Sequence, residues 1–146
     1  MQLHTFLPYR LAVLSESVSQ AMAQVYRERF GLSRDEWRVL AQLAELGQAR
    51  TAEVIARTTL DKMQVSRAVA RLERDGLLER SADPDDGRGY LLALTAAGRA
   101  LHARVVPMVQ AREQFLLEAL APRERELLLQ AMEKMQQRAE QLLRQG

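Results

Sequence analysis

Polar and cationic side chains recur at helical spacing near the middle of this 146-residue chain. Gln64, Arg67, Arg71 and Arg74 are three, four and three positions apart, so they share one face of a helix. Arginine pairs bidentately with the edge of guanine, and glutamine pairs with adenine. This row therefore predicts a helix in the major groove of duplex DNA, with Gln64 and Arg67 on base edges and with Arg71 and Arg74, deeper along the helix, on phosphates.

Further side chains around this row are expected to extend the contact with DNA. Lys62 and Ser66 lie near the start of the same helix, where base and phosphate contacts are both in reach. Arg88 follows in a loop, and we expect it to enter a minor groove, oriented by a charge-assisted hydrogen bond that it donates to Asp86. The expected DNA-binding residues are Lys62, Gln64, Ser66, Arg67, Arg71, Arg74, Arg88 and Thr51.

The elements that position these side chains follow from local signals. Asp61 is a good N-cap, and the helix that it begins should run to about Asp75. A short helix over Ala52–Thr58 comes before it, and the two helices together make a helix-turn-helix pattern. Leu77–Ser81 and Tyr90–Leu94 read as two strands joined by a loop. An Asp-Gly step inside that loop is expected to supply the positive φ of a hairpin turn.

Long helices are predicted on both sides of this centre. One helix has Pro8 in its first turn and ends at Gly31, and Ser33 caps a second helix that buries Trp37. Thr95 should cap a helix to about Leu120, kinked or broken at Pro107, and Pro122 should begin a last helix to about Arg144. The apolar stripes are Leu7, Leu11, Leu14, Val18, Ala21 and Val25 in the first helix, and Leu128, Ala131, Met135, Ala139 and Leu142 in the last.

Such stripes need a partner surface, and a second copy of the chain is the expected partner. The predicted fold class is mainly α (α+β), a winged helix-turn-helix core with a two-stranded wing, flanked by N- and C-terminal dimerisation helices. Residues 1–31 and 99–146 are assigned to the helical dimerisation region. Residues 32–98 are assigned to the DNA-binding lobe.

Composition excludes several other classes of function. Hydrophobic residues make up 47% of the chain and charged residues 27%, which fits a folded domain. There is no cysteine, so disulfides and thiolate metal sites are excluded. The two histidines, His4 and His102, are far apart in sequence, and no nucleophile–base motif is visible. We expect no enzyme activity, no cofactor and no metal, no membrane span or secretory signal, and a cytoplasmic location.

Bulk charge does not by itself point to DNA. The net charge is +2, and residues 50–98 carry eight basic and eight acidic side chains. Only the placement of cations on one face favours nucleic acid. The alternative is a ligand-binding or protein-interaction module of the same fold that does not read DNA. A positive strip interrupted by Glu73, Asp75 and Asp85 would favour that alternative.

The region from Asp61 to Thr95 resembles the winged helix-turn-helix core of the MarR (multiple antibiotic resistance regulator) family. The order of helices extends this resemblance to nearly the whole chain. Two positions depart from the family pattern, because Gly87 stands where an arginine is common and Ala121 stands where a Ser or Thr cap is usual. The matching residues are Val65-Ser66-Arg67, Arg71-Leu72-Glu73, Gly76-Leu77, Arg80, Asp83-Pro84, Asp86-Gly87-Arg88, Leu94-Thr95 and Gly98.

The resemblance implies a homodimer that binds a palindromic operator in double-stranded DNA and regulates nearby genes, usually as a repressor. It also implies release by a small aromatic or anionic effector, bound between the first two helices and the fifth. Arg10 would pair with an anionic ligand, and Tyr9 or Trp37 would stack on an aromatic one. The competing interpretation is that Trp37 is ordinary core and Arg10 an ion-pair partner. The candidate effector-binding residues are Tyr9, Arg10, Leu14, Trp37 and Leu40.

Overall fold

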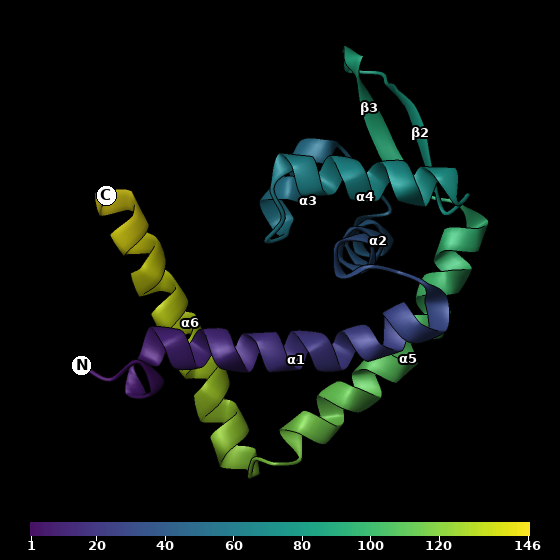
Figure 1. Cartoon of the computed structure of the whole chain (residues 1–146). Helices are drawn as coiled ribbons and strands as arrows, with labels where there is room; N and C mark the ends of the chain where they lie inside the picture. The colour runs from purple at the N-terminus through teal and green to yellow at the C-terminus, as the bar shows by residue number, and fades with distance from the viewer. The chain divides into compact units, whose positions relative to one another are not determined.

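Helices dominate the computed structural model, which describes all 146 residues (Figure 1). The chain divides into two compact units, residues 1–109 and residues 110–146, which are described separately below. The elements in chain order are a 3-10 turn (Leu3–Thr5), α1 (Leu7–Phe30), α2 (Arg34–Leu46), β1 (Gln48–Ala49), α3 (Thr51–Arg57), α4 (Lys62–Arg74), β2 (Leu78–Asp83), β3 (Asp86–Leu94), α5 (Ala96–Leu117) and α6 (Pro122–Gln145). The boundary between the two units falls inside α5. The predicted assignment of residues 1–31 and 99–146 to dimerisation and of residues 32–98 to DNA binding stays a prediction.

The ends of α1 and α2 are where the sequence signals place them. Pro8 lies in the first turn of α1, and Gly31 ends that helix with a φ of 67°, a left-handed conformation that glycine adopts without strain. Ser33 caps α2, since its hydroxyl accepts a hydrogen bond from the Glu36 N–H at 3.1 Å. These two predictions are confirmed.

The core of the first unit lies between α2, α3, α4 and the sheet, and the second half of α1 and the first part of α5 contribute buried side chains to it. The inward face of α4 buries Val65, Ala68, Val69 and Leu72, at the spacing of one helical stripe. The same buried cluster contains three fully buried side chains of α2: Val39, Leu40 and Leu43. The opposite face of α4 is therefore left to solvent.

The sheet differs from the prediction in two ways. It has three antiparallel strands in the order β1-β3-β2, because Gln48–Ala49 adds a short strand at one edge. The hairpin strands are also longer than predicted, and only Pro84-Asp85 separates them. The predicted Asp-Gly turn is wrong, since Gly87 lies in β3 without a positive φ.

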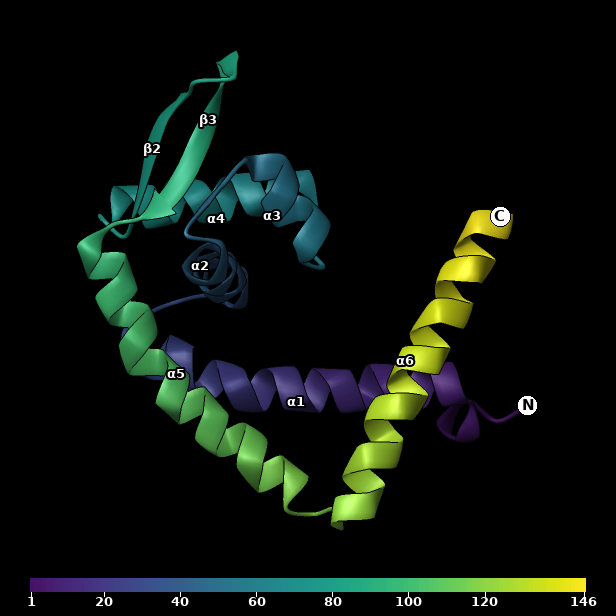
Figure 2. The same ribbon diagram turned by 180° about the vertical axis from the view of Figure 1, so that it is seen from behind.

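The hairpin turn forms two residues earlier than predicted, at Pro84-Asp85, because of Asp83. Its carboxylate accepts a hydrogen bond from the Asp85 N–H at 2.9 Å and so closes the turn around Pro84. Asp83 pairs with Asp86, while Ala82 pairs with Tyr90, so the register shifts within the hairpin. Figures 1 and 2 show this wing extending beyond α3 and α4.

The start of α5 is packed tightly against the hairpin base. Thr95 caps the helix as predicted, since its hydroxyl accepts from the Gly98 N–H at 3.1 Å and donates to the Gly76 carbonyl at 2.6 Å. A side chain at Gly98 would place its Cβ 2.0 Å from the Leu77 carbonyl oxygen. Glycine is therefore required here by close approach rather than by φ.

Two predictions about the later helices were inexact. The helix continues through Pro107 without a break and ends at Leu117, three residues earlier than expected. The last helix begins at Pro122 as predicted. Glu124 offsets the missing cap, because its carboxylate accepts from the Ala121 N–H at 2.8 Å. No helix combines the length and hydropathy that crossing a bilayer requires.

Candidate nucleic-acid interface and effector site

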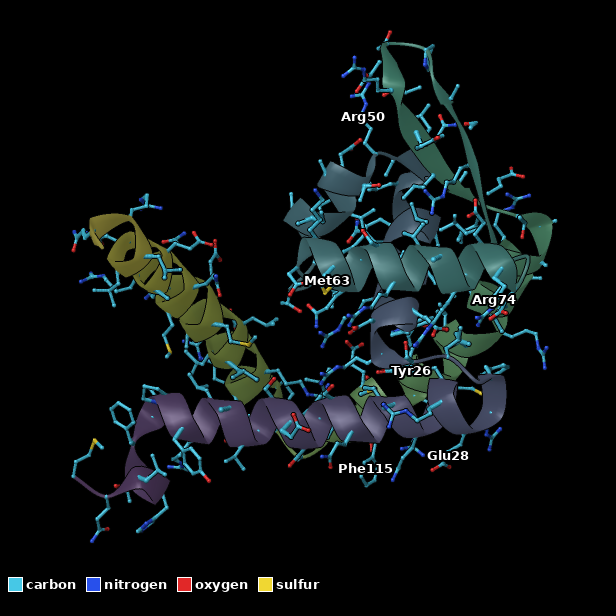
Figure 3. All side chains as sticks on the ribbon, turned by 45° about the horizontal axis from the view of Figure 1, so that its top comes forward. Tyr26, Glu28, Arg50, Met63, Arg74 and Phe115 are labelled. Carbon is cyan, nitrogen blue, oxygen red and sulfur yellow. The ribbon has the colours of Figure 1, made fainter.

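The exposed face of α4 carries the predicted row of side chains. Arg67, Arg71 and Arg74 are all exposed, while Gln64 is half-buried. Figure 3 shows the two ends of this surface, with Met63 near the start of α4 and Arg74 near its end. The structure therefore brings the predicted row together on one side of the helix.

The arginines of this row differ in what holds them. Arg71 lies 3.7 Å from the carboxylate of Glu36, which is buried at the start of α2. Arg74 pairs with Asp75 at 3.6 Å. Arg67 has neither an ion pair nor a hydrogen bond within the chain, and the same is true of Lys62. The unpaired cations thus lie in the half of α4 nearest its N-terminus.

Of the three acidic side chains that could interrupt a positive strip, two pair with cations outside the row on α4, and the third pairs with a cation of the row itself. Glu73 pairs with Arg80 at 3.2 Å, and Asp85 lies 3.6 Å from Arg50. Asp75, as above, pairs with Arg74. Residues 50–98 carry equal numbers of basic and acidic side chains, but this balance does not mean that every basic side chain has an ion-pair partner. Arg57, Lys62, Arg67 and Arg88 remain without an ion-pair partner.

The wing presents Arg88 on β3, between two glycines. We expected the Asp86 carboxylate to hold its guanidinium, but that carboxylate accepts the backbone N–H of Arg88 instead, at 3.1 Å. Gly89 leaves room for this contact, since a Cβ there would lie 3.0 Å from the Asp86 carboxylate. The hydrogen bond fixes the backbone, while the guanidinium itself stays free to bind a ligand.

The turn end of the wing is held by an ion pair that no sequence pattern predicted. Arg50, which precedes α3, donates to both carboxylate oxygens of Asp83, at 2.5 and 3.3 Å (Figure 3). Asp83 is buried, and this guanidinium lowers the pKa of its carboxyl group, helped by the Asp85 N–H. The two residues are 33 positions apart, and no sequence pattern predicts a pair at that separation. It fixes the wing to the helix-turn-helix.

Gln64 and Thr51 are both half-buried, and the side chain of Gln64 also makes a structural contact. The side-chain oxygen of Gln64 accepts the Asp61 N–H at 2.9 Å, and the Asp61 carboxylate accepts the Gln64 N–H at 2.8 Å. This capping box engages the oxygen that a bidentate contact with adenine would use. Thr51 is the first residue of α3 and half-buried, and Ser66 is exposed on α4.

The five candidate effector residues do not share one cavity. Tyr9, Arg10 and Leu14 line an open groove of about 780 Å³ along the exposed first half of α1. Leu40 is fully buried in the core and lines no cavity. Trp37 alone lies at the junction of helices where the resemblance puts a pocket.

Trp37 is held in an aromatic stack that connects three helices. Its ring stacks on Tyr26 of α1 and on His102 of α5, with centroid separations of 5.6 Å on each side. Burial lowers the pKa of His102, which favours the neutral imidazole. Two cavities meet at Trp37, one of about 260 Å³ between α1 and α2 and one of about 340 Å³ between α2 and α3.

Arg38 lines both of these cavities and was not among the candidates. Its guanidinium donates to the Thr59 hydroxyl at 2.9 Å, just before the cap of α4. Its position directly after Trp37 is the one signal in the sequence that could have indicated it. An aromatic wall and a cation thus stand side by side on α2. Histidine, aspartate and glutamate side chains nowhere form a group of three that could hold a metal ion.

Comparisons with known proteins agree with this architecture. The HTH-type transcriptional regulator YxaD of Bacillus subtilis is 35% identical over 106 residues, covering 70% of this chain and 74% of that protein. The HTH-type transcriptional repressor Rv2887 of Mycobacterium tuberculosis is 32% identical over 123 residues, covering 83% and 85%. A structure of Bordetella bronchiseptica BpsR, whose DNA binding is regulated by 6-hydroxynicotinic acid, superposes with a TM-score of 0.84 at 26% identity, covering 93% and 96%.

A sequence model of the MarR family matches residues 30–89, which span α2, the helix-turn-helix and most of the wing. The relatives above extend the likeness into the flanking helices. The chain therefore belongs to the MarR family of transcriptional regulators.

Proposed function

We propose that this protein is a homodimeric repressor that places α4 of each protomer in a major groove and Arg88 of each wing in a flanking minor groove. The observation that carries this proposal is the set of cations without intramolecular partners. Lys62 and Arg67 lie on the exposed face of α4, and Arg88 lies on the wing. Cations that have no partner in the free protein are available to phosphates and base edges.

The row on α4 divides into reading and positioning roles. Arg67 is free to pair bidentately with guanine, whereas Arg71 and Arg74, held by Glu36 and Asp75, are suited to phosphate contacts. Gln64 keeps its oxygen in the capping box, so its amide nitrogen would donate one hydrogen bond. Ser66, Lys62 and Thr51 complete the set as base or phosphate contacts.

Dimerisation is supported by apolar side chains that the single chain leaves exposed. The first half of α1 exposes Leu7, Leu11 and Leu14, and none of the side chains of α6 is buried. Seven large apolar side chains of α6 are exposed: Leu127, Leu128, Leu129, Met132, Met135, Leu142 and Leu143. Patches of this kind mark protein–protein contacts. A two-fold dimer would present two copies of α4 to an inverted-repeat operator.

An aromatic, anionic effector is the ligand class that the surroundings of Trp37 favour. The indole offers a stacking surface, and the adjacent Arg38 offers a cation to a carboxylate. BpsR, whose fold this chain shares, is regulated by an aromatic acid of this kind. A ligand carboxylate would compete with Thr59 for Arg38 and so act next to the cap of α4.

The direct test compares single-arginine variants on operator DNA. Fragments bound by the protein would be selected from the source genome, and affinities measured by fluorescence anisotropy at fixed salt. We expect Arg67→Ala to lose about 1–3 kcal/mol per contact and to relax specificity at one base position. Arg88→Ala should weaken binding mainly to sites with A·T flanks. Arg123→Ala, which removes an exposed arginine of α6, should bind like the unmodified protein.

Salt supplies a second readout of the same proposal. The logarithm of the affinity should fall linearly with the logarithm of salt, with a slope near −0.9 for each phosphate neutralised. Arg71→Ala should make that slope shallower by about two per dimer, because one phosphate contact is lost in each protomer. Equal affinities for all variants, or selection that returns no enriched sequence, would overturn the proposal.

A further inference from the structure

Met63 stands out on the exposed face of α4. It is the second residue of the helix, and 61% of its surface is open to solvent. At 100° per residue, the direction opposite the buried stripe of α4 passes through Met63, Arg67, Ala70 and Arg74. Met63 therefore lies on the centre line of the surface that faces away from the core (Figure 3).

An exposed methionine is not explained by the stability of the free protein. Within residues 32–98, the large apolar side chains classed as exposed are Met63 and Tyr90. The ring of Tyr90 has the guanidinium of Arg80 over it at 5.7 Å, whereas Met63 has no such cover. Helix propensity does not select methionine either, since lysine, glutamine and glutamate form helices about as well.

We propose that Met63 contacts the C5-methyl group of a thymine in the major groove and so sets base preference at one position of each half-site. The inference rests on the proposed function, because it assumes that α4 enters the groove. Thymine is the only base that presents a methyl group there, and apolar side chains recognise it by contact. Contact with that methyl group would remove the exposed thioether from water.

The position of that thymine follows from helix geometry. Met63 and Arg67 are four residues apart, which is about 6 Å along the axis of α4. Base pairs are spaced about 3.4 Å apart. The thymine should therefore lie one or two base pairs from the guanine that Arg67 contacts. The operator should carry this pair of bases in each half-site at the same spacing.

The test removes the methyl group from the DNA rather than from the protein. Each thymine of the selected operator would be replaced in turn by uracil, which differs only in lacking that methyl. We expect one thymine per half-site at which the unmodified protein loses about fourfold in affinity, the value of burying one methyl-sized group. Symmetric replacement in both half-sites should cost about sixteenfold.

Variants of Met63 assign the effect to this side chain. Met63→Gln keeps the length and helix propensity but not the apolar end, so its affinity should be the same for thymine and uracil at that position. Met63→Leu should keep most of the discrimination. Circular dichroism and the dimer mass would show that both variants fold and assemble like the unmodified protein.

The outcomes separate this inference from the proposed function. If Met63→Gln discriminates thymine from uracil as the unmodified protein does, the inference is wrong, while loss of binding in Arg67→Ala would still support DNA reading. If no thymine shows sensitivity in the unmodified protein, the inference is also wrong. If the unmodified protein selects no DNA, the proposed function fails and the inference fails with it.

Discussion

Replacing Gly98 by alanine should destabilise the protein, although alanine is the better helix former. The added Cβ would lie 2.0 Å from the carbonyl oxygen and 3.0 Å from the carbonyl carbon of Leu77. Both are backbone atoms, so no side-chain rotation relieves the contact. The Leu77 carbonyl also accepts the Thr95 N–H at 3.0 Å, which ties it to the first turn of α5.

The magnitudes decide the sign of the change. Alanine gains at most about 1 kcal/mol over glycine from helix propensity. Forcing a methyl group into a packed contact costs about 1–3 kcal/mol, and loss of the Thr95 hydrogen bond adds about 0.5–1.5 kcal/mol. We therefore expect a net loss of about 1–3 kcal/mol in the free energy of unfolding.

Urea unfolding followed by circular dichroism measures this loss. With a slope of about 1–3 kcal/mol per molar urea, the midpoint should fall by roughly 1 M. Protein concentration must be held fixed, because the stability of the proposed dimer depends on it. Gly87→Ala is the matched control, since a Cβ there meets nothing within 4 Å and its φ is not positive. A Gly98→Ala midpoint equal to or above that of Gly87→Ala would refute the steric reasoning.

Two further predictions concern the aromatic stack. Trp37 is the only tryptophan, so binding of an aromatic carboxylate such as 6-hydroxynicotinic acid should change the protein's fluorescence. Arg38→Gln should weaken that binding, because it removes the cation that would pair with the carboxylate. An unchanged fluorescence spectrum at saturating ligand would contradict an effector site at Trp37. Burial holds the pKa of folded His102 below its ordinary value of 6.5, so the unfolded chain takes up the proton more readily and stability should decline as the pH falls through 6.5. In urea titrations between about pH 7.5 and 5.5, the free energy of unfolding of His102→Phe should decline less than that of the unmodified protein. Equal declines in the variant and in the unmodified protein would contradict this role of His102.

Elements with strong local signals were predictable from the sequence. Ser33, Asp61 and Thr95 each cap a helix through a hydrogen bond made within three residues, so neighbouring sequence is enough to identify them. The spacing of the arginines on α4 likewise follows from the period of the helix. These features depend on short stretches of chain.

Features that depend on distant residues were missed. The two-residue strand β1 is too short to show alternation, and it exists only because β3 offers an edge. The hairpin turn is at Pro84-Asp85 rather than at Gly87 because the Asp83 carboxylate accepts a hydrogen bond there. The ion-pair partner of Asp83 is Arg50, which precedes α3. Tyr26 and His102 become neighbours of Trp37 only when α1 and α5 pack beside α2, so the sequence alone could not identify them.

Three consecutive residues of α2 point in three directions. Glu36 pairs with Arg71 of α4, Trp37 stacks between Tyr26 and His102, and Arg38 bonds to Thr59 ahead of the α4 cap. A single turn of α2 thus carries part of the candidate effector site and also contacts both α4 and the segment just before it. Coupling between two binding sites is reciprocal: if an effector lowers the affinity for the operator by some factor, the operator must lower the affinity for the effector by the same factor.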